Sequence, residues 1–255
     1  MSRPLGRHEH GQNFLVDPAV PAALAAVAES WEPRPLLELG PGDGALTAAL
    51  LRRLPGRPLT AVELDPHLVA RLRRRFGDAV SVVHGDLLHT RLDRPVDVVS
   101  NVPYALTTPL LRRLLAAPHW RHALLLVQWE VARKRAAVGP TSALTARWWP
   151  WFEFRLHGRV PARAFRPVPA VDGGVLEVAR RATPLLDAPR GGYQRLVDAV
   201  FTGRGRGVVD VVARRHGRVV ARDWARSCGI GPRALPRDLD ARAWVLLHDR
   251  VTGRT

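Results

Sequence analysis

One short segment carries residue types suited to methyl transfer onto a base amine: Asn101-Val102-Pro103-Tyr104. An exocyclic adenine amine is a poor nucleophile, because its lone pair is delocalised into the ring. Two acceptors on its N–H groups localise that lone pair while it attacks a methyl sulfonium. The Asn101 amide and the Val102 carbonyl are candidate acceptors, and Tyr104 offers a stacking surface for a base. The alternative is a strand-to-loop turn that happens to use Asn and Pro.

Two acidic residues precede this segment, each at the end of an apolar run. Glu63 follows such a run, and a carboxylate there can accept both hydroxyls of a ribose. Asp86 ends the next run, where it can accept from an adenine amino group. The alternatives are a helix cap near Asp65-Pro66 for the first residue and an ordinary Gly-Asp turn for the second.

A glycine turn lies further upstream, within Glu38-Leu39-Gly40-Pro41-Gly42-Asp43-Gly44. Glycines between a strand and a helix let the backbone approach a ligand closely, although a plain strand-to-helix turn would also use them. The spacing is G-x-G-x-G, which differs from the G-x-G-x-x-G of dinucleotide binders. This difference disfavours a nicotinamide-dependent oxidoreductase.

Alternating strands and helices must position these residues. Apolar runs predict strands, and amphipathic segments between them predict helices, in the pattern typical of a parallel α/β sheet. The predicted strands are 36–39, 60–64, 80–84, 96–100 and 123–128, and the predicted helices are 17–29, 46–54, 66–76 and 109–115. The candidate residues then fall at the carboxyl ends of neighbouring strands, where ligands bind in such sheets.

Composition bounds the class of protein. The chain has 255 residues, 46% hydrophobic and 24% charged, which is ordinary for a globular protein. A single cysteine, Cys228, excludes an internal disulfide and a cysteine-based metal cluster. The spacing of the histidines predicts no metal site. No run of about 18 uncharged apolar residues is present, so we expect no membrane span and a cytoplasmic location.

The charge balance is strongly positive. Lys and Arg total 39 against 23 Asp and Glu, a net charge of +16, and Lys134 is the only lysine. Arginine in place of lysine can reflect a G+C-rich genome, but that does not explain the shortage of carboxylates. The balance therefore favours a polyanionic partner, and nucleic acid over a membrane surface.

The charge and the predicted secondary structure of the chain change after about residue 180. The segment 190–255 holds 14 arginines and 6 acidic residues, with helix-like stretches at 208–216 and 240–248. We predict a larger α/β domain over residues 1–182 and a small, basic, helical domain over 183–255.

The order of these motifs resembles the ribosomal RNA adenine N6-methyltransferases, a group that includes the Erm resistance enzymes and the small-subunit adenine dimethyltransferases. The resemblance extends over nearly the whole chain. The matching segments are 11–15, 37–47, 61–65, 84–88, 101–104 and 165–172. It implies a Rossmann-like class I methyltransferase fold with a small helical C-terminal domain. One departure is Ser100, where relatives commonly carry glycine.

The resemblance also implies roles for single residues. The cofactor would be S-adenosylmethionine. Its contacts would fall on Asn13, Leu15, Gly40, Glu63, Asp86 and Asn101. Catalysis would involve Asn101 and Tyr104, with Phe165 as a second stacking partner for a flipped base.

Two segments resemble the arginine-rich Erm group, namely 128–135 and 148–152. The Erm assignment implies N6-methylation of one adenine in large-subunit ribosomal RNA, before full assembly, by a monomeric enzyme. The implied result is resistance to macrolides, lincosamides and streptogramin B. The alternatives are a small-subunit dimethyltransferase and a non-catalytic nucleic-acid-binding factor on the same fold.

Two clusters outside the motifs remain. Arg133, Lys134 and Arg135 follow the fifth predicted strand, and we expect them to contact RNA. The aromatic cluster 148–154 could stack on bases, but we favour core or interdomain packing, since aromatic side chains mainly bury apolar area.

Overall fold

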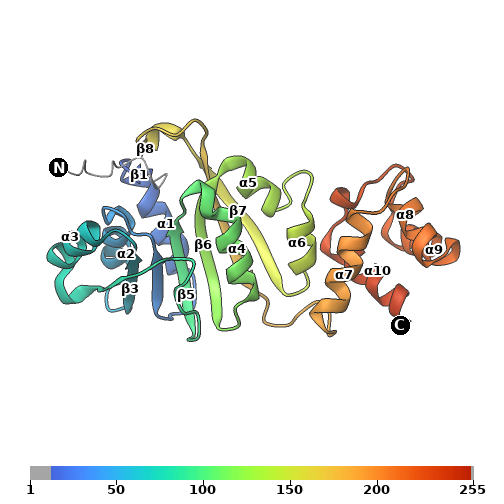
Figure 1. Ribbon diagram of the computed structural model, residues 1–255, viewed down its shortest axis with the longest axis horizontal. Helices are drawn as coiled ribbons and strands as arrows, with labels where there is room; N and C mark the ends of the chain where they lie inside the picture. Colours follow the sequence, from blue (N-terminus) through green and yellow to red (C-terminus); the bar gives the residue numbers. More distant parts are fainter. Residues whose placement is uncertain (1–12, 254–255) are drawn as a thin grey trace, which may run out of the picture. The chain divides into compact units, whose positions relative to one another are not determined.

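A computed structural model of the chain describes residues 13–253 (Figure 1). Gly11 and Gln12 of the N-terminal motif lie outside the described residues. Packing divides the rest into two compact units. The first unit holds the described residues up to Ala132 together with Arg155–Ala179, and the second holds Arg133–Phe154 and the described residues from Arg180 onward. The boundary at 182/183 stays a prediction.

The elements are these. The strands are β1 Phe14–Leu15, β2 Leu36–Leu39, β3 Leu59–Glu63, β4 Ser81–His84, β5 Val96–Asn101, β6 Trp120–Gln128, β7 Phe152–Val160, β8 Phe165–Arg166 and β9 Gly173–Arg180. The α-helices are α1 Ala19–Glu29, α2 Ala45–Arg53, α3 Pro66–Phe76, α4 Thr107–Ala116, α5 Trp129–Arg135, α6 Ala143–Trp148, α7 Arg190–Phe201, α8 Val208–His216, α9 Arg218–Cys228 and α10 Ala241–Thr252.

Seven of the described strands form one sheet in the order β4-β3-β2-β5-β6-β9-β7. The first five are parallel, as the alternating pattern predicts, and β9 pairs antiparallel with β6. β2 is buried along its whole length, which explains its near-continuous run of leucines. Strand order reverses between β2 and β5, so their carboxyl ends flank the crevice where a ligand binds in this type of sheet.

A second, two-stranded sheet joins distant parts of the first unit. β1 pairs antiparallel with β8, with Phe14 opposite Arg166 and Leu15 opposite Phe165. Leu15 and Phe165 are both buried and belong to one hydrophobic core with β2, β3, α1 and α2. This pairing holds the start of the described chain beside the carboxyl ends of the sheet.

The second unit is built around aromatic residues, as expected for the cluster 148–154. Trp149, Trp151, Phe152 and Phe154 are all buried. The Tyr193 ring meets Trp151 edge-on at 5.5 Å, and its hydroxyl donates to the Ala146 carbonyl at 2.8 Å. These side chains therefore pack the unit and do not present stacking surfaces. No helix in the described part of the chain is long and apolar enough to cross a bilayer.

Candidate active site

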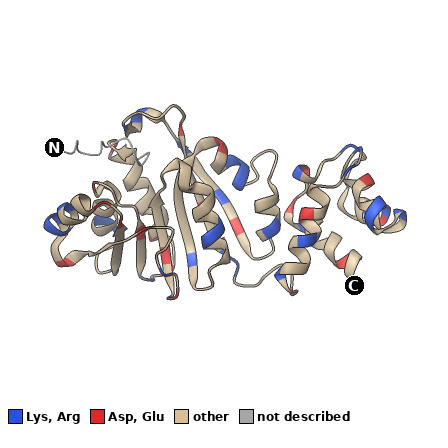
Figure 2. Ribbon diagram, in the orientation of Figure 1, with Lys and Arg blue, Asp and Glu red and all other residues tan. Residues whose placement is uncertain are grey.

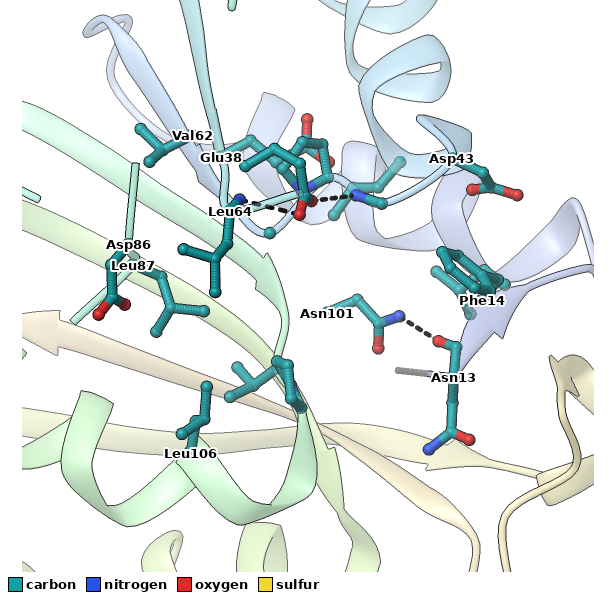
Figure 3. A pocket seen from close by; sticks show the side chains of 18 of the residues that line it. Asn13, Phe14, Glu38, Asp43, Val62, Leu64, Asp86, Leu87, Asn101 and Leu106 are labelled. Carbon is teal, nitrogen blue, oxygen red and sulfur yellow. Dashed lines mark hydrogen bonds between the residues drawn. The ribbon is translucent and has the colours of Figure 1, made fainter. Parts of the chain in front are cut away.

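A pocket of about 440 Å³ opens at the carboxyl ends of β2, β3, β4 and β5 (Figure 3). All but one of the motif residues assigned to cofactor or base line it. The lining includes Asn13, Phe14, Leu15, Glu38, Gly40, Gly42, Val62, Glu63, Leu64, Asp86, Leu87, Asn101, Pro103 and Tyr104. Segments separated by up to about ninety positions in the chain thus converge on one cavity, as the strand-end argument predicts.

The glycine turn forms one wall of the pocket. Gly40, Gly42 and Gly44 all have positive φ, a region that other residues rarely adopt. Space also demands glycine, because a Cβ on Gly44 would lie 2.7 Å from the Phe76 ring and one on Gly42 would lie 3.0 Å from Phe14. The turn therefore presents bare backbone to the cavity and leads directly into α2.

Glu63 is 1% exposed and fixes this turn. One carboxylate oxygen accepts from Gly42 N at 3.0 Å, and the other accepts from Leu64 N at 2.9 Å and Asp65 N at 3.0 Å. The helix-cap alternative belongs to Asp65, which accepts from His67 N at the start of α3. Glu63 is thus a preorganised acceptor on the pocket wall, since Oε2, which accepts only from Gly42 N, keeps lone-pair capacity.

Asp86 lines the same pocket and also shapes its own turn. Its carboxylate accepts from Leu88 N at 2.8 Å and lies 2.6 Å from His89 Nδ1. The bond from Leu88, followed by that from His89, lowers the pKa of Asp86 below its usual value. The side chain is ionised at neutral pH and is oriented before any ligand binds.

Asn101 projects into the cavity at the end of β5 (Figure 3). Its Nδ2 donates to the Asn13 carbonyl oxygen at 2.8 Å. A carbonyl can only accept, so this bond fixes which way the amide points. Oδ1 is left facing the pocket as an acceptor, which is the orientation that methyl transfer to an amine requires.

Tyr104 begins a short 3-10 helix, Tyr104–Leu106, at the pocket rim. The residue is partly buried, and its hydroxyl is buried without a hydrogen-bond partner. Burial, followed by the charge of Asp172, raises the pKa of Tyr104. The phenol stays neutral at neutral pH, so the ring and not a phenolate is what the pocket offers.

Phe165 does not fit the stacking role predicted from the resemblance. Its side chain is fully buried, and it does not line the pocket. Its ring packs against the backbone of Gly173, where an added Cβ would come within 3.2 Å, and it belongs to the hydrophobic core with Leu126 and Val175. In this structure the residue supports the β1–β8 pairing and does not face the pocket.

Two pocket residues lie inside the motifs but were not singled out from the sequence. Phe14 sits between the predicted contacts Asn13 and Leu15, and its ring covers Gly42. Glu38 is fully buried within β2, and Thr47 Oγ1 donates to one of its oxygens at 2.7 Å. The other oxygen, Oε1, has no partner. An acidic residue in an otherwise apolar strand is the signal that could have found Glu38.

Glu38 makes the stability of the fold depend on pH. Burial, with added repulsion from Glu63 and Asp43, raises its pKa from 4.5 to about 7. The folded state therefore favours the neutral acid. The stability that Glu38 contributes in this form is fully present below the pKa of the unfolded state, and it is lost as the pH rises through about 7. Glu38→Gln copies the neutral form at every pH.

We therefore expect Glu38→Gln to gain free energy of unfolding relative to the parent protein, by roughly 1–2 kcal/mol, as pH rises from about 5 to about 8. Urea unfolding of both proteins across that range measures the difference. A difference that does not vary with pH would contradict a raised pKa at Glu38.

The predicted RNA-contact residues lie in α5, directly after β6. Lys134 is exposed, whereas Arg133 and Arg135 are partly buried. Arg135 Nη1 donates to Ser142 Oγ at 2.6 Å, so it also ties α5 to the start of α6. Of the three, Lys134 is the most available for contact with phosphate.

Comparison with known proteins identifies the family. The model of the ribosomal RNA adenine dimethylase family matches residues 4–248. The chain belongs to this family. The mycinamicin-resistance protein MyrB of Micromonospora griseorubida is 54% identical over 95% of this chain and 78% of its own length. An rRNA adenine N-6-methyltransferase of Corynebacterium diphtheriae is 46% identical over 82% of this chain and 83% of its own.

Solved structures agree with this family. The 23S rRNA methyltransferase ErmE superposes with a TM-score of 0.87 at 33% identity, covering 94% of this chain and all of that one. The protein is therefore an rRNA adenine N6-methyltransferase of the Rossmann-like class I fold, and its cofactor is S-adenosylmethionine.

The pocket of this family member suits such a cofactor. A buried acceptor faces it from Glu63, the unpartnered Glu38 Oε1 adds a buried polar group, and the apolar side chains of Val62, Leu64 and Leu87 line it as well. A Cβ on Gly42 would press on the Phe14 ring, which lines the pocket, so glycine keeps the backbone bare there. A ribose, a purine and a cationic amino-acid portion each find matching chemistry there.

Proposed function

We propose that the protein methylates N6 of a specific adenine in large-subunit (23S) ribosomal RNA and thereby confers resistance to macrolides, lincosamides and streptogramin B. The observation that carries this proposal is the orientation of Asn101, whose amide oxygen faces the pocket because Nδ2 is held by Asn13. The similarity to a mycinamicin-resistance protein and to a 23S rRNA methyltransferase supports the choice of RNA and of phenotype. A methylated N6 is bulkier and donates fewer hydrogen bonds to a drug.

S-adenosylmethionine, when bound, supplies an electrophilic methyl group. We assign its binding to Asn13, Leu15, Gly40, Glu63, Asp86 and Asn101, which line one cavity. Glu63 would accept from the ribose hydroxyls and Asp86 from the adenine. The bare backbone of the glycine turn would lie against the amino-acid portion.

Asn101 and Tyr104 would act on the target base. The Asn101 oxygen and the Val102 carbonyl would each accept one N–H of the base amine, which localises the nitrogen lone pair in the direction of attack. The Tyr104 ring would stack on the base and hold it out of the RNA. No strong base is needed, because the amine sheds a proton to solvent once it is methylated.

The finer partner assignments belong to the same proposal. The enzyme would act as a monomer in the cytoplasm on ribosomal RNA that is not yet fully assembled. Positive charge would supply sequence-independent affinity for RNA. Figure 2 shows Lys and Arg along α3 and α5 of the ribbon.

Radiolabelled cofactor with purified RNA tests the proposal. We expect label in adenine of naked 23S RNA and none in assembled small-subunit particles. Label only in small-subunit particles would favour the small-subunit alternative, which other relatives illustrate at 33% identity. Nucleic-acid binding without any transfer would favour a non-catalytic factor.

RNA affinity should fall steeply with salt, because each phosphate contact releases counterions. Replacing Lys134 with alanine should lower the slope of log K against log salt by about one and weaken binding to any RNA sequence several-fold. Arg52→Ala is a matched control, since Arg52 is exposed in the last turn of α2, which begins at the pocket and leads away from it. An unchanged slope for Lys134→Ala would remove this residue from the interface.

A further inference from the structure

Three exposed valines lie on the two segments of the first unit that the β1–β8 pairing joins. Val16 follows β1 and is 49% exposed, whereas Val168 and Val171 lie in the loop between β8 and β9 and are 55% and 46% exposed. Val16 N donates to the Ala164 carbonyl at 2.9 Å, just before β8, which ties the two segments together. We call these three residues the valine corner.

The valine corner is fixed beside the pocket. β1 and β8 pair residue by residue, and Phe14 of β1 lines the pocket. At the other end of the loop, the Asp172 carbonyl accepts from Trp129 N at 2.9 Å, and the Asp172 carboxylate accepts from Ala162 N at 2.7 Å and Arg159 Nε at 2.6 Å. Both ends of the loop are therefore held by hydrogen bonds to neighbouring elements of the first unit.

Two exposed arginines lie close to Val168 and Val171 in the chain. Arg163 and Arg166 are exposed, and neither forms an ion pair with a carboxylate in the described part of the chain. Arg166 donates only to main-chain carbonyls, those of Arg163 and Phe165. Asp172, the nearby acid, is already paired with Arg159. Figure 2 shows this basic stretch along the β8 segment.

Small apolar side chains beside exposed arginines match the chemistry of an unstacked RNA strand. Base faces are apolar and flat, and each nucleotide carries a phosphate within reach of a neighbouring guanidinium. A base can reach a pocket such as this one only if its stacking neighbours are left without a partner. Apolar side chains inserted at such a step cover the exposed faces.

We propose that the valine corner, with Arg163 and Arg166, packs against the nucleotides that flank the target adenine and holds them apart while that adenine occupies the pocket. This inference rests on the proposed function. Val168 and Val171 contact the exposed base faces, and the two arginines contact adjacent phosphates. The valines are positioning residues that act on neighbouring nucleotides and not on the reacting atoms.

The test is a comparison of two RNAs and two variants. One RNA is a 23S hairpin with the target adenine, and the other is the same hairpin with an abasic nucleotide beside that adenine, which removes its stacking partner. We expect V168A/V171A to lower kcat/KM about tenfold on the intact hairpin and less than about threefold on the abasic one. KM for S-adenosylmethionine should not change.

Val219→Ala is the matched control, because Val219 is 62% exposed and lies in α9 of the second unit. With this variant, kcat/KM on both RNAs should stay within about twofold of the value for the parent protein. A fluorescent 2-aminopurine next to the target adenine reports unstacking independently of methyl transfer. The increase in its fluorescence on protein binding should be smaller with V168A/V171A than with the parent protein.

Equal losses on both RNAs, or no loss on the intact one, would overturn the inference while the parent enzyme stays active. A change in the association state of V168A/V171A without a change in transfer would instead mark a surface for self-association. Failure of the parent enzyme to methylate either RNA would refute the proposed function itself.

Discussion

Asn101→Ala should lower the rate of methyl transfer by about three orders of magnitude while RNA affinity stays within a few-fold. In the proposed mechanism the amide oxygen accepts from the base amine, and alanine offers no replacement. The same substitution removes the bond from Nδ2 to Asn13, so some loss of cofactor affinity should accompany it. Single-turnover transfer and RNA titration separate the two effects.

Ser100→Gly is the matched control for that experiment. Ser100 is buried next to Asn101 and donates to the Leu39 carbonyl at 2.6 Å, which links β5 to β2. Removing this hydroxyl perturbs the same strand end but leaves the amide in place, so transfer should fall less than about tenfold. Comparable losses in the two variants would mean that strand geometry, and not the amide, limits the reaction.

Glu63→Ala should be the second most damaging change, acting on cofactor binding and on stability together. Three main-chain N–H groups, those of Gly42, Leu64 and Asp65, lose their acceptor in a buried site. The expected loss is about 3 kcal/mol of unfolding free energy, with about a hundredfold weaker cofactor binding. Denaturant unfolding and calorimetric titration with S-adenosylhomocysteine measure these quantities.

Glu63→Gln keeps the prediction testable should the alanine variant fail to fold. Glutamine retains one acceptor oxygen but turns an NH₂ group towards main-chain donors, so an intermediate loss is expected. Cofactor affinity equal to that of the parent protein in the glutamine variant would show that the carboxylate is structural only.

Much of the sheet could be predicted because local pattern and global packing agree. Leu36–Leu39 and Pro66–Phe76 form the predicted strand and helix with the predicted bounds, and the other early elements shift by one to three residues. Buried parallel strands produce long apolar runs, and a glycine turn or the Asn-x-Pro segment at 101–103 ends them. Placing Glu63, Asp86 and Asn101 at strand ends therefore also placed them in one cavity.

The features that were missed depend on distant contacts. The pairing of β1 with β8 joins residues about 150 positions apart, and two-residue strands leave no periodic signal. That pairing, with Gly173 behind it, buries Phe165. The ring therefore packs in the core, whereas the resemblance implied that it stacks on a base. The grouping of 133–154 with the C-terminal segment likewise depends on aromatic contacts that no local pattern encodes.

The fixed orientation of Asn101 makes the central claim directly measurable. A mass-spectrometric map of ribosomal RNA should be made from cells that express the parent protein or Asn101→Ala at equal levels. We predict N6-methylation at a single adenine of 23S RNA with the parent protein and its absence with the variant. Methylation that persists with Asn101→Ala, or that appears only in small-subunit RNA, would contradict the account.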